Sequence, residues 1–471
     1  MKALGVTLII FILLNSYLFA QHTTELYKVF GSPYSSTINC ICTDMDGSTY
    51  VGGEFTKSLL MGPYKFKDKW GGFIAKVDDQ NQVIWMKRAD MKFRNMELID
   101  SSLIVFAQNS QTVNFAGTEL QYRGQNFNSV LASISINTGD VKWIKEISGE
   151  GDVYAADMTI CKKDIFITGS FRVGMALDKY TLKQTHEKNN FIARLTAEGK
   201  VIWLNKVSGG DSFITGATIS AIAANQNGDF VISGEIAGSA DFAGYCFDVA
   251  EFNSKSENTT SEGCVYYAYF TGDGKCIRVN KAITEAEVTD IALFGDQVYL
   301  CGYYSGAYLL QRPIAASIFG DTVVLNSVQS PTGSLLETWF VISLRDNEPL
   351  WALTTKGKNS SRALSLVVDD QGSCYAGGYF YDHIILPDGS EVNAINAEFS
   401  AGALVMKIDR SGKLLWTHTA SSPTGINKFF DVSLNHSLVV CGEISGSAVF
   451  DKSLIQSRGK HQNGFTYKFD L

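Results

Sequence analysis

Three glutamates stand at the same place in a recurring sequence pattern, directly after a glycine that ends an apolar run. They are Glu54, Glu235 and Glu443. Carboxyl groups that converge can act as acid and base, and glycosidases use two of them about 5–10 Å apart. We therefore treat these glutamates as candidate axial charges of a closed repeat fold.

Basic residues recur at a second shared position of the same pattern. They are Lys76, Arg194, Lys407 and Lys468. Antiparallel pairing of the two runs could place a glutamate diagonally across from a basic residue on one face. Two interpretations stay open, namely ion pairs within each repeat and a charged site in a central channel.

Other motifs of catalysis and metal binding are missing. There is no His-Glu-x-x-His, no Gly-x-Ser-x-Gly and no phosphate-binding loop, and the six histidines are dispersed. Acidic turns at 44–47, 225–229 and 369–372 lack the full register of a calcium loop, so we expect ordinary turn chemistry there. The sequence predicts no catalytic residue, no cofactor and no metal.

Long insertions separate two of the repeated strands at 237–263 and 305–337. Insertions of this kind decorate one face of a repeat protein, where partners commonly bind. The aromatic residues that we expect to contact a partner are Tyr245, Phe252, Tyr304, Tyr308 and Phe319. Drift without selection is the alternative explanation for these insertions.

The elements that position these residues belong to a repeat marked by tryptophan. Trp85, Trp143, Trp203, Trp351 and Trp416 each follow two apolar or long side chains after a short turn. Each unit contains an apolar strand, a polar turn, a strand ending in glycine, a third strand and the Trp strand. Four short strands with tight turns make one blade of a β-propeller, and we expect each Trp to be a structural wedge between blades.

Seven units can be counted, and the last one lacks its Trp strand. The segment 25–31 resembles a Trp strand, with Tyr27 in the Trp place. We therefore predict an all-β, seven-bladed β-propeller of four-stranded antiparallel blades, whose ring is closed by pairing of the N-terminal strand with the last blade. Closure removes a free sheet edge, which would otherwise favour aggregation.

The recurring patterns Gly-Glu-[Phe/Ile]-x-Gly-Ser, Phe-Ile-Ala-Lys-[Val/Ile]-Asp and Gly-Lys-x-x-Trp resemble secreted bacterial β-propeller repeat proteins of the SBBP type. The resemblance is clearest at 53–55, 73–78, 191–203, 234–242, 407–416 and 442–450. The run 197–203 is also similar to the tryptophan-docking motif of quinoprotein-like propellers. These resemblances imply the fold and export, but no activity.

A short apolar run at 8–14 follows Lys2, and Leu18-Phe19-Ala20 precedes Gln21. This pattern predicts a signal peptide over 1–20, followed by a single propeller domain over 21–471. The residue directly after Ala20 is Gln21 and not a cysteine, so we expect no lipid anchor, and we expect no membrane insertion after cleavage. The expected location is outside the cell, in the periplasm or at the cell surface.

The formal net charge is −8, and Lys and Arg are scattered along the chain, which argues against nucleic acid as a partner. Of nine cysteines, most lie in apolar strand runs, where free Cys packs as a small hydrophobic residue. Only Cys246, Cys264 and Cys276 are placed for a local disulfide.

From these features we expect a monomeric, exported, non-catalytic scaffold that binds a protein or a glycan at the cell envelope or outside the cell. The alternative is a carbohydrate-active hydrolase or lyase that uses axial carboxylates.

Overall fold

A computed structural model describes residues 27–469 apart from short stretches, the longer of which are 121–126, 210–215, 250–262, 305–315, 319–322, 330–334 and 395–399. The described residues form strands and turns, and none of them lies in a helix. The all-β expectation is confirmed. In the described part of the chain, no helix is available that could cross a membrane.

The main strands assemble into antiparallel sheets in which most of them follow one another in chain order, with short strands often inserted between the second and the third. The first three are sheet 1 (β2 Ser36–Thr43, β3 Thr49–Met61, β4 Tyr64–Val77, β5 Val83–Arg88), sheet 2 (β6 Lys92–Ile99, β7 Ser102–Asn109, β10 Asn128–Ser135, β11 Val141–Ile147) and sheet 3 (β12 Val153–Cys161, β13 Asp164–Phe171, β16 Lys188–Thr196, β17 Val201–Gly209).

The next three sheets repeat this order, and the first strand of sheet 4 is split in two. They are sheet 4 (β18 Gly216–Ala217 with β19 Ala221–Ala224, β20 Phe230–Ala237, β23 Cys264–Phe270, β24 Cys276–Thr284), sheet 5 (β25 Ala286–Phe294, β26 Gln297–Tyr304, β31 Thr338–Arg345, β32 Glu348–Thr354) and sheet 6 (β34 Ser361–Val368, β35 Cys374–Tyr381, β38 Ala401–Ile408, β39 Leu414–Ser421).

Sheet 7 combines the two ends of the chain. Its strands are β40 (Asn427–Leu434), β41 (Leu438–Ile444), β44 (Asn463–Phe469) and β1 (Tyr27–Phe30). Strand β1 runs antiparallel to β44, with Tyr27 opposite Tyr467 and Phe30 opposite Gly464. Phe30 is fully buried, so the pairing also inserts a large side chain into the core.

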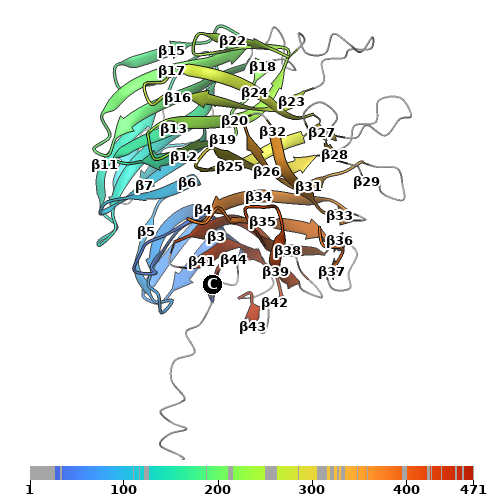
Figure 1. Ribbon diagram of the computed structural model, residues 1–471. Coiled ribbons are helices and arrows are strands. Elements are labelled where there is room, and N and C mark those ends of the chain that lie inside the picture. Colours follow the sequence, from blue (N-terminus) through green and yellow to red (C-terminus); the bar gives the residue numbers. More distant parts are fainter. Residues whose placement is uncertain are drawn as a thin grey trace, which may run out of the picture.

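The first strands of the sheets contact one another in chain order, and β40 also contacts β2. In Figure 1, β6, β12, β19, β25 and β34 gather near the middle of the molecule, and β11, β15 and β22 lie at its periphery. Each of the hydrophobic core clusters lies between two adjacent sheets, including one between sheet 7 and sheet 1 that contains Phe30, Val51 and Val439. The core is therefore a series of layers between sheets.

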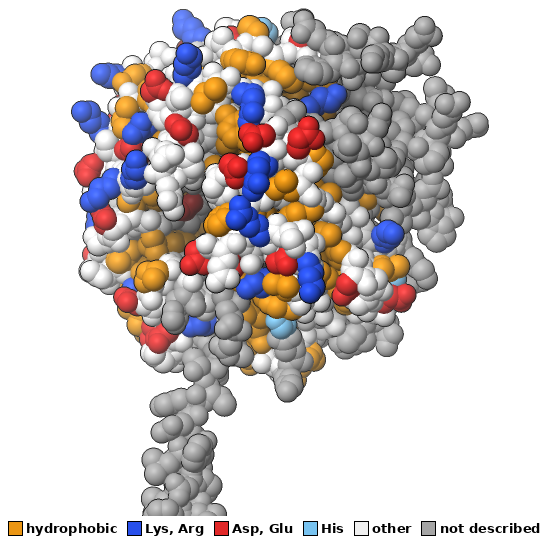
Figure 2. All heavy atoms as spheres, in the orientation of Figure 1, with side chains coloured by type: hydrophobic (Ala, Val, Ile, Leu, Met, Phe, Trp, Pro, Cys, Tyr) orange, Lys and Arg blue, Asp and Glu red, His pale blue; other side chains and the backbone are white. Residues whose placement is uncertain are grey.

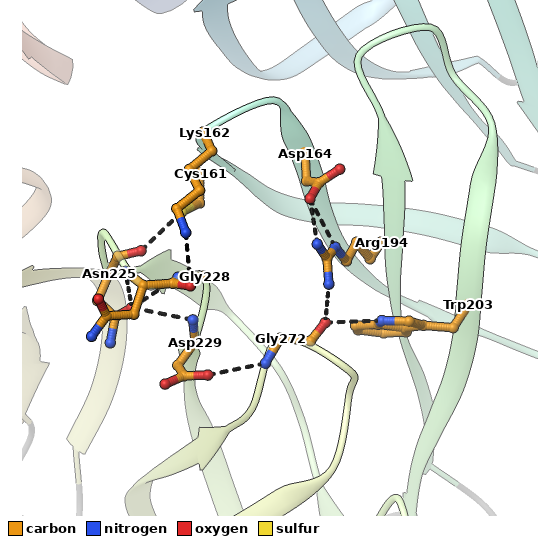
Figure 3. Close-up of polar contacts among 10 residues, drawn as sticks. Cys161, Lys162, Asp164, Arg194, Trp203, Asn225, Gly228, Asp229 and Gly272 are labelled. Carbon is orange, nitrogen blue, oxygen red and sulfur yellow. Dashed lines mark hydrogen bonds and ion pairs between the residues drawn. The ribbon is translucent and has the colours of Figure 1, made fainter.

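The tryptophans join neighbouring sheets, as the sequence predicts. Trp203 of sheet 3 donates from Nε1 to the carbonyl of Gly272 in sheet 4 at 3.1 Å, and Arg194 donates to the same carbonyl at 2.7 Å (Figure 3). Nε1 of Trp85, Trp143 and Trp351 donates to Ile136, Ala197 and Arg410 of the next sheet at 2.9–3.0 Å. The indole lies against a turn glycine.

Only glycine fits that turn position. Gly199 has a φ of +79°, and a Cβ there would come within 2.9 Å of the Trp143 ring. Gly412 has a φ of +89°, and its Cβ would come within 2.5 Å of the Trp351 ring. The repeated Gly before the Trp strand is therefore explained by both the backbone conformation and the close approach of the ring.

Short hairpins between the second and third strands reach back to the preceding sheet. Strand β21 (Ser239–Phe242) pairs with β17, β27 (Ala316–Ile318) pairs with β24, and β42 (Ser447–Phe450) pairs with β39. The partners of β21, β27 and β42 in their own hairpins are β22 (Tyr245–Asp248), β28 (Val323–Leu325) and β43 (Ser453–Gln456). The described parts of the long insertions thus link sheets.

The remaining short strands are β8 (Val113–Phe115), β9 (Thr118–Leu120), β14 (Gly174–Leu177), β15 (Tyr180–Lys183), β29 (Val328–Gln329), β30 (Leu335–Leu336), β33 (Lys356–Gly357), β36 (His383–Ile385) and β37 (Glu391–Asn393).

Candidate functional site

A central cavity of about 470 Å³ is lined by the first strands of sheets 1 to 7. The lining begins at the middle of each strand, as with Asn95 in β6 and Asp157 in β12, and continues to the strand end. No Lys, Arg or His belongs to the lining, whereas Glu97, Asp157, Asp290 and Asp431 do. The cavity is therefore acidic without a basic residue among its described walls.

A shared irregularity places the polar residues of the lining. The pairing register shifts in β12 between Ala155 and Asp157, in β25 between Val288 and Asp290, and in β40 between Phe429 and Asp431. Such a bulge adds one residue to the strand and redirects the side chains beyond it. The three aspartates hence occupy equivalent positions beside the cavity.

Each of these aspartates bonds to the backbone of the next sheet. Asp157 Oδ2 accepts from Ile222 N at 2.9 Å, Asp290 Oδ2 accepts from Leu366 N at 2.8 Å, and Asp431 Oδ2 accepts from Ile41 N at 2.9 Å. The other carboxyl oxygen accepts from the N–H of the following residue in the same strand. We call these three contacts the aspartate clamps.

Two side chains add further hydrogen bonds to the clamps. Asn95 Nδ2 donates to Asp157, and Ser365 Oγ donates to Asp431 at 2.9 Å. Burial raises the pKa of Asp157 and of Asp431 to about 6 although these donors act in the opposite direction. Burial, and then the charge of Asp157, raises the pKa of Asp290.

Glu97 differs from the aspartates in having no clamp. It lies two residues after Asn95, so its side chain lies on the same side of β6 and lines the cavity. No described residue makes a hydrogen bond to it. Its side chain is partly exposed, and it lines the cavity. Burial, and then the charges of Asp157, Asp431 and Asp290, raise the pKa of Glu97 to about 8.

The glutamates that the sequence singles out lie elsewhere. Glu54 pairs with Thr37, and Glu443 with Lys428, near the beginning of the first strands. The cavity lining starts about four residues further along, a distance of about 13 Å along a strand. None of Glu54, Glu235 and Glu443 lines the cavity. Glu54 accepts from Asn39 Nδ2 at 2.8 Å and from Trp70 Nε1 at 2.9 Å.

Three of the four basic residues form ion pairs within their own sheets, but their partners are aspartates and not the glutamates that the sequence singles out. Lys76 lies 3.7 Å from Asp44, Lys407 lies 3.8 Å from Asp369, and Arg194 pairs with Asp164. In β3 and β4 the register places Tyr50 opposite Lys76, whereas Glu54 is opposite Gly72. The four-residue separation along β3 prevents contact between the glutamate and the lysine.

Glu443 is almost fully buried, with 8% exposure. Burial raises its pKa, and the charge of Lys428 partly offsets this effect.

Of the expected partner-binding aromatics, Tyr245 is exposed at 37% and lies in β22. Tyr304 is 1% exposed and packs in the core between sheets 4 and 5, so its side chain is not at the surface. Phe252, Tyr308 and Phe319 lie outside the described residues.

A second polar group lies at the beginning of the first strands of sheets 6 and 7. Arg362 forms an ion pair with Glu337, and its guanidinium lies 4.3 Å from the centre of the Tyr303 ring. Lys428 Nζ lies 4.5 Å from the centre of the Tyr379 ring and 5.6 Å from that of Tyr381. We call Tyr303, Arg362, Tyr379, Tyr381 and Lys428 the cation–aromatic cluster; all except the buried Tyr303 are partly exposed.

Charges of both signs alternate over the described part of the face seen in Figure 2, with hydrophobic side chains between them. All nine cysteines are unpaired, eight are buried and Cys246 is exposed, so the expected packing role of most of them is confirmed, and Cys246, Cys264 and Cys276 form no disulfide. Among the described residues, no group of three His, Cys, Asp or Glu side chains is placed to hold a metal ion.

The acidic turns have ordinary turn chemistry. Asp44 Oδ1 accepts from Asp46 N and Ser48 N, and Asp369 Oδ1 accepts in the same way from Gln371 N and Ser373 N.

Sequence reasoning missed the aspartate clamps and Glu97. A signal for the clamps exists, because Asp157-Met158, Asp290-Ile291 and Asp431-Val432 occur at one position of the first strand in the repeat. No comparable signal marks Glu97, whose place in sheet 2 is taken by small or apolar residues in the other sheets.

No family model matches the chain, and no curated protein matches its sequence. Among solved structures, BamB from Moraxella catarrhalis is 10% identical, with 93% of this chain and 99% of that chain covered and a TM-score of 0.33. Quinohemoprotein alcohol dehydrogenase from Comamonas testosteroni is 8% identical, with 94% and 76% covered and a TM-score of 0.36.

A europium-containing methanol dehydrogenase is 10% identical, with 96% and 95% covered and a TM-score of 0.37. At these scores the likenesses carry no inference about activity, so the function of this chain must be inferred from its own geometry.

Proposed function

We propose that the chain is an exported, seven-bladed β-propeller that acts as a non-catalytic scaffold and binds a protein or a glycan at the cell envelope or outside the cell. Sheets 1 to 7 are its blades, and β1 completes the last blade. The pairing of β1 with β44, the contact of β40 with β2 and the bond from Ile41 N to Asp431 support the closed ring.

The cation–aromatic cluster carries the proposal of a binding role. Tyr and Arg are enriched at the centres of protein interfaces, because they combine a large contact area with few rotatable bonds. Here Arg362 is held by Glu337 and by the Tyr303 ring, and Lys428 is held between Tyr379 and Tyr381. Side chains that are fixed before binding lose less conformational entropy when a partner docks.

The long insertions of sheets 4 and 5 supply the rest of the partner surface in this proposal, with Tyr245 as their described contact residue. The insertion of sheet 5 joins β26 to β31, and Tyr303 lies at the end of β26. The insertion of sheet 5 and the cation–aromatic cluster therefore lie at the same end of sheet 5.

We do not extend the proposal to a carbohydrate-active enzyme. None of Glu54, Glu235 and Glu443 lines the central cavity, where two carboxyl groups would have to converge on a substrate.

Site-specific photo-crosslinking in the producing cell tests the binding role. A photoreactive residue in place of Tyr381 should give one discrete crosslinked species. The matched control replaces Ile202, which is 38% exposed on the outer strand β17. A crosslinked species that needs position 381 and is lost in Arg362→Ala supports the proposal, and equal or absent crosslinking at both positions contradicts it.

Export is tested on the same material by sequencing the purified protein from its N-terminus. The proposal expects Gln21 as the first residue in the cell envelope or medium fraction. A chain that keeps Met1 and stays in the cytoplasm contradicts it.

A further inference from the structure

We infer that the central cavity binds an organic cation, an ammonium or guanidinium group, through the carboxylate of Glu97. This site goes beyond the proposed scaffold role, since it lies on the axis and shares no residue with the cation–aromatic cluster. The inference rests on the volume and the lining of the cavity, on the lack of a described hydrogen-bond partner of Glu97 and on the charge of the walls.

Glu97 is the only charged residue at its position in the seven first strands that line the cavity. The residues at the equivalent position of the other sheets, two after the bulge, are small or uncharged. They are Cys42, Thr159, Ala223, Ala292, Val367 and Ser433, and all line the cavity. A single carboxyl group thus projects among short side chains that leave space in front of it. A volume of about 470 Å³ is within the range of small-molecule sites, roughly 300–1,000 Å³.

The bonding of the four acidic residues separates Glu97 from the others. The aspartates use their oxygens on backbone N–H groups, which fixes their orientation. Glu97 has no described hydrogen-bond partner, and its partly exposed side chain lines the cavity. A carboxyl group that has no described protein partner and faces a cavity is free to accept hydrogen bonds from a group that arrives from outside.

The charge of the walls favours a cation over a neutral ligand. The cavity contains four acidic side chains and no basic one among its lining residues. An ammonium or guanidinium group supplies both positive charge and several N–H donors. A chelated metal ion fits less well, because no set of three ligands is placed for one among the described residues. The cation can be a free amine or a Lys or Arg side chain of a partner.

Calorimetric titration of the mature full-length protein tests the inference. Putrescine is the free amine, a Gly-Lys-Gly peptide provides a side-chain ammonium, and 1,4-butanediol is the uncharged analogue of putrescine. At pH 8.5 we expect saturable binding of putrescine or of the peptide and none of butanediol. Binding of only one amine identifies the source of the cation, and either result supports the site.

Glu97→Gln should weaken amine binding at least tenfold, because the amide carries no charge. Glu348→Gln is the matched control, since Glu348 is exposed on β32. Circular dichroism and thermal unfolding establish that both variants fold. Equal affinity in Glu97→Gln and the wild type, binding of butanediol, or absence of binding by both amines would overturn the inference.

The pH dependence gives a second readout. The titratable groups that face Glu97 are Cys42 from β2, Asp157 from β12, Asp290 from β25 and Asp431 from β40, and the lining parts of β19 and β34 supply none. Since Glu97 must lose its proton to bind a cation, affinity should rise about tenfold per pH unit from pH 6 to 8. An affinity that is independent of pH would contradict the role of Glu97. Crosslinking at Tyr381 is a separate measurement, so the two proposals can fail independently.

Discussion

Adjacent sheets are joined in two chemically different ways. One kind of contact lies beside the central cavity, which we call the axis, and the other lies on the fourth strands of the sheets, which we call the rim. At the axis, the clamps Asp157, Asp290 and Asp431 accept backbone N–H groups of the next sheet. At the rim, tryptophan indoles donate to turn carbonyls of the next sheet. The first kind depends on a titratable group, whereas the second is neutral and independent of pH.

The two kinds of contact are distributed unequally. The junctions from sheet 3 to 4 and from sheet 5 to 6 have both, and those from sheet 1 to 2 and from sheet 2 to 3 have a tryptophan contact. The junction from sheet 7 to 1 has a clamp but no tryptophan, because β1 carries Tyr27 in that place. There Lys28 Nζ donates to Asn81 O at 2.7 Å. The junction that joins the chain ends therefore relies on charged groups and on the pairing of β1.

Among the substitutions that test this comparison, Phe30→Ala should lower the free energy of unfolding most. Phe30 is fully buried between sheets 7 and 1, and its ring stacks on Phe73 at a centroid distance of 5.9 Å. Truncation of a buried Phe costs about 3–5 kcal/mol of unfolding free energy. We expect a loss of this size in denaturant unfolding, measured by fluorescence.

The control is Leu454→Ala, a substitution of an exposed residue beside the same strand, and it should cost little. If Phe30→Ala unfolds like the control, β1 does not hold the junction, and the clamp alone carries it.

The second prediction distinguishes the acidic residues at the cavity from the tryptophans, because only the acidic residues should make the stability depend on pH. Glu97 has a pKa of about 8, and Asp157 and Asp431 have pKa values of about 6, all above those of unfolded carboxyl groups, about 4. The folded state thus binds more protons than the unfolded state between pH 4 and 8. Stability from these groups is present at pH 4 and is lost as the pH rises through 6 and then 8.

Each unit of pKa difference corresponds to about 1.4 kcal/mol, so the loss should amount to a few kcal/mol. Thermal unfolding in buffers from pH 5 to 9 measures it. Glu97→Gln should remove the part of the decline between about pH 6 and 8, and Glu348→Gln should leave the decline unchanged. A melting temperature that rises from pH 5 to 8.5 in the wild type would show that the cavity charges are compensated.

The difference between rim and axis also explains what could be predicted from the sequence. The rim contacts repeat the same residues, Trp and the turn Gly, at a fixed place, so the units and the role of the tryptophans could be inferred from spacing alone. The axis depends on the bulge after Ala155, Val288 and Phe429, which changes the side that a residue faces. Simple alternation along the strand therefore does not identify Asp157 or Glu97 as lining residues.

The expected pairing of Glu54 with Lys76 failed for a related reason. Sharing adjacent strands does not bring two residues together unless the register does, and here Lys76 is opposite Tyr50. The register of β3 and β4 is set by the turn that joins Met61 to Tyr64, whereas Asp44, the partner of Lys76, lies in the turn between β2 and β3.

A smaller difference in stability should separate a tryptophan that makes a hydrogen bond to the next sheet from one that does not. Trp203→Phe keeps an aromatic ring but removes the bond to Gly272 O, and it should cost about 1 kcal/mol more than Trp416→Phe. Trp416 packs on Tyr375 and His418, and no described residue accepts a hydrogen bond from its Nε1. Denaturant unfolding of both variants gives the difference, and equal costs would mean that the rim contacts act by packing alone.

The smallest expected effect is that of Lys28→Met, which removes the cationic contact at the junction of sheets 7 and 1. A partly buried charged hydrogen bond to a carbonyl is worth about 1 kcal/mol or less once the retained packing of the side-chain stem is considered. The loss should be the same at pH 5 and pH 8, since the carbonyl group of Asn81 does not titrate, whereas the net contribution of the desolvated Asp431 to stability falls as its carboxyl group ionises. If the cost of Lys28→Met instead grows with pH, Lys28 and Asp431 hold the junction as one coupled unit, and rim and axis are not independent there.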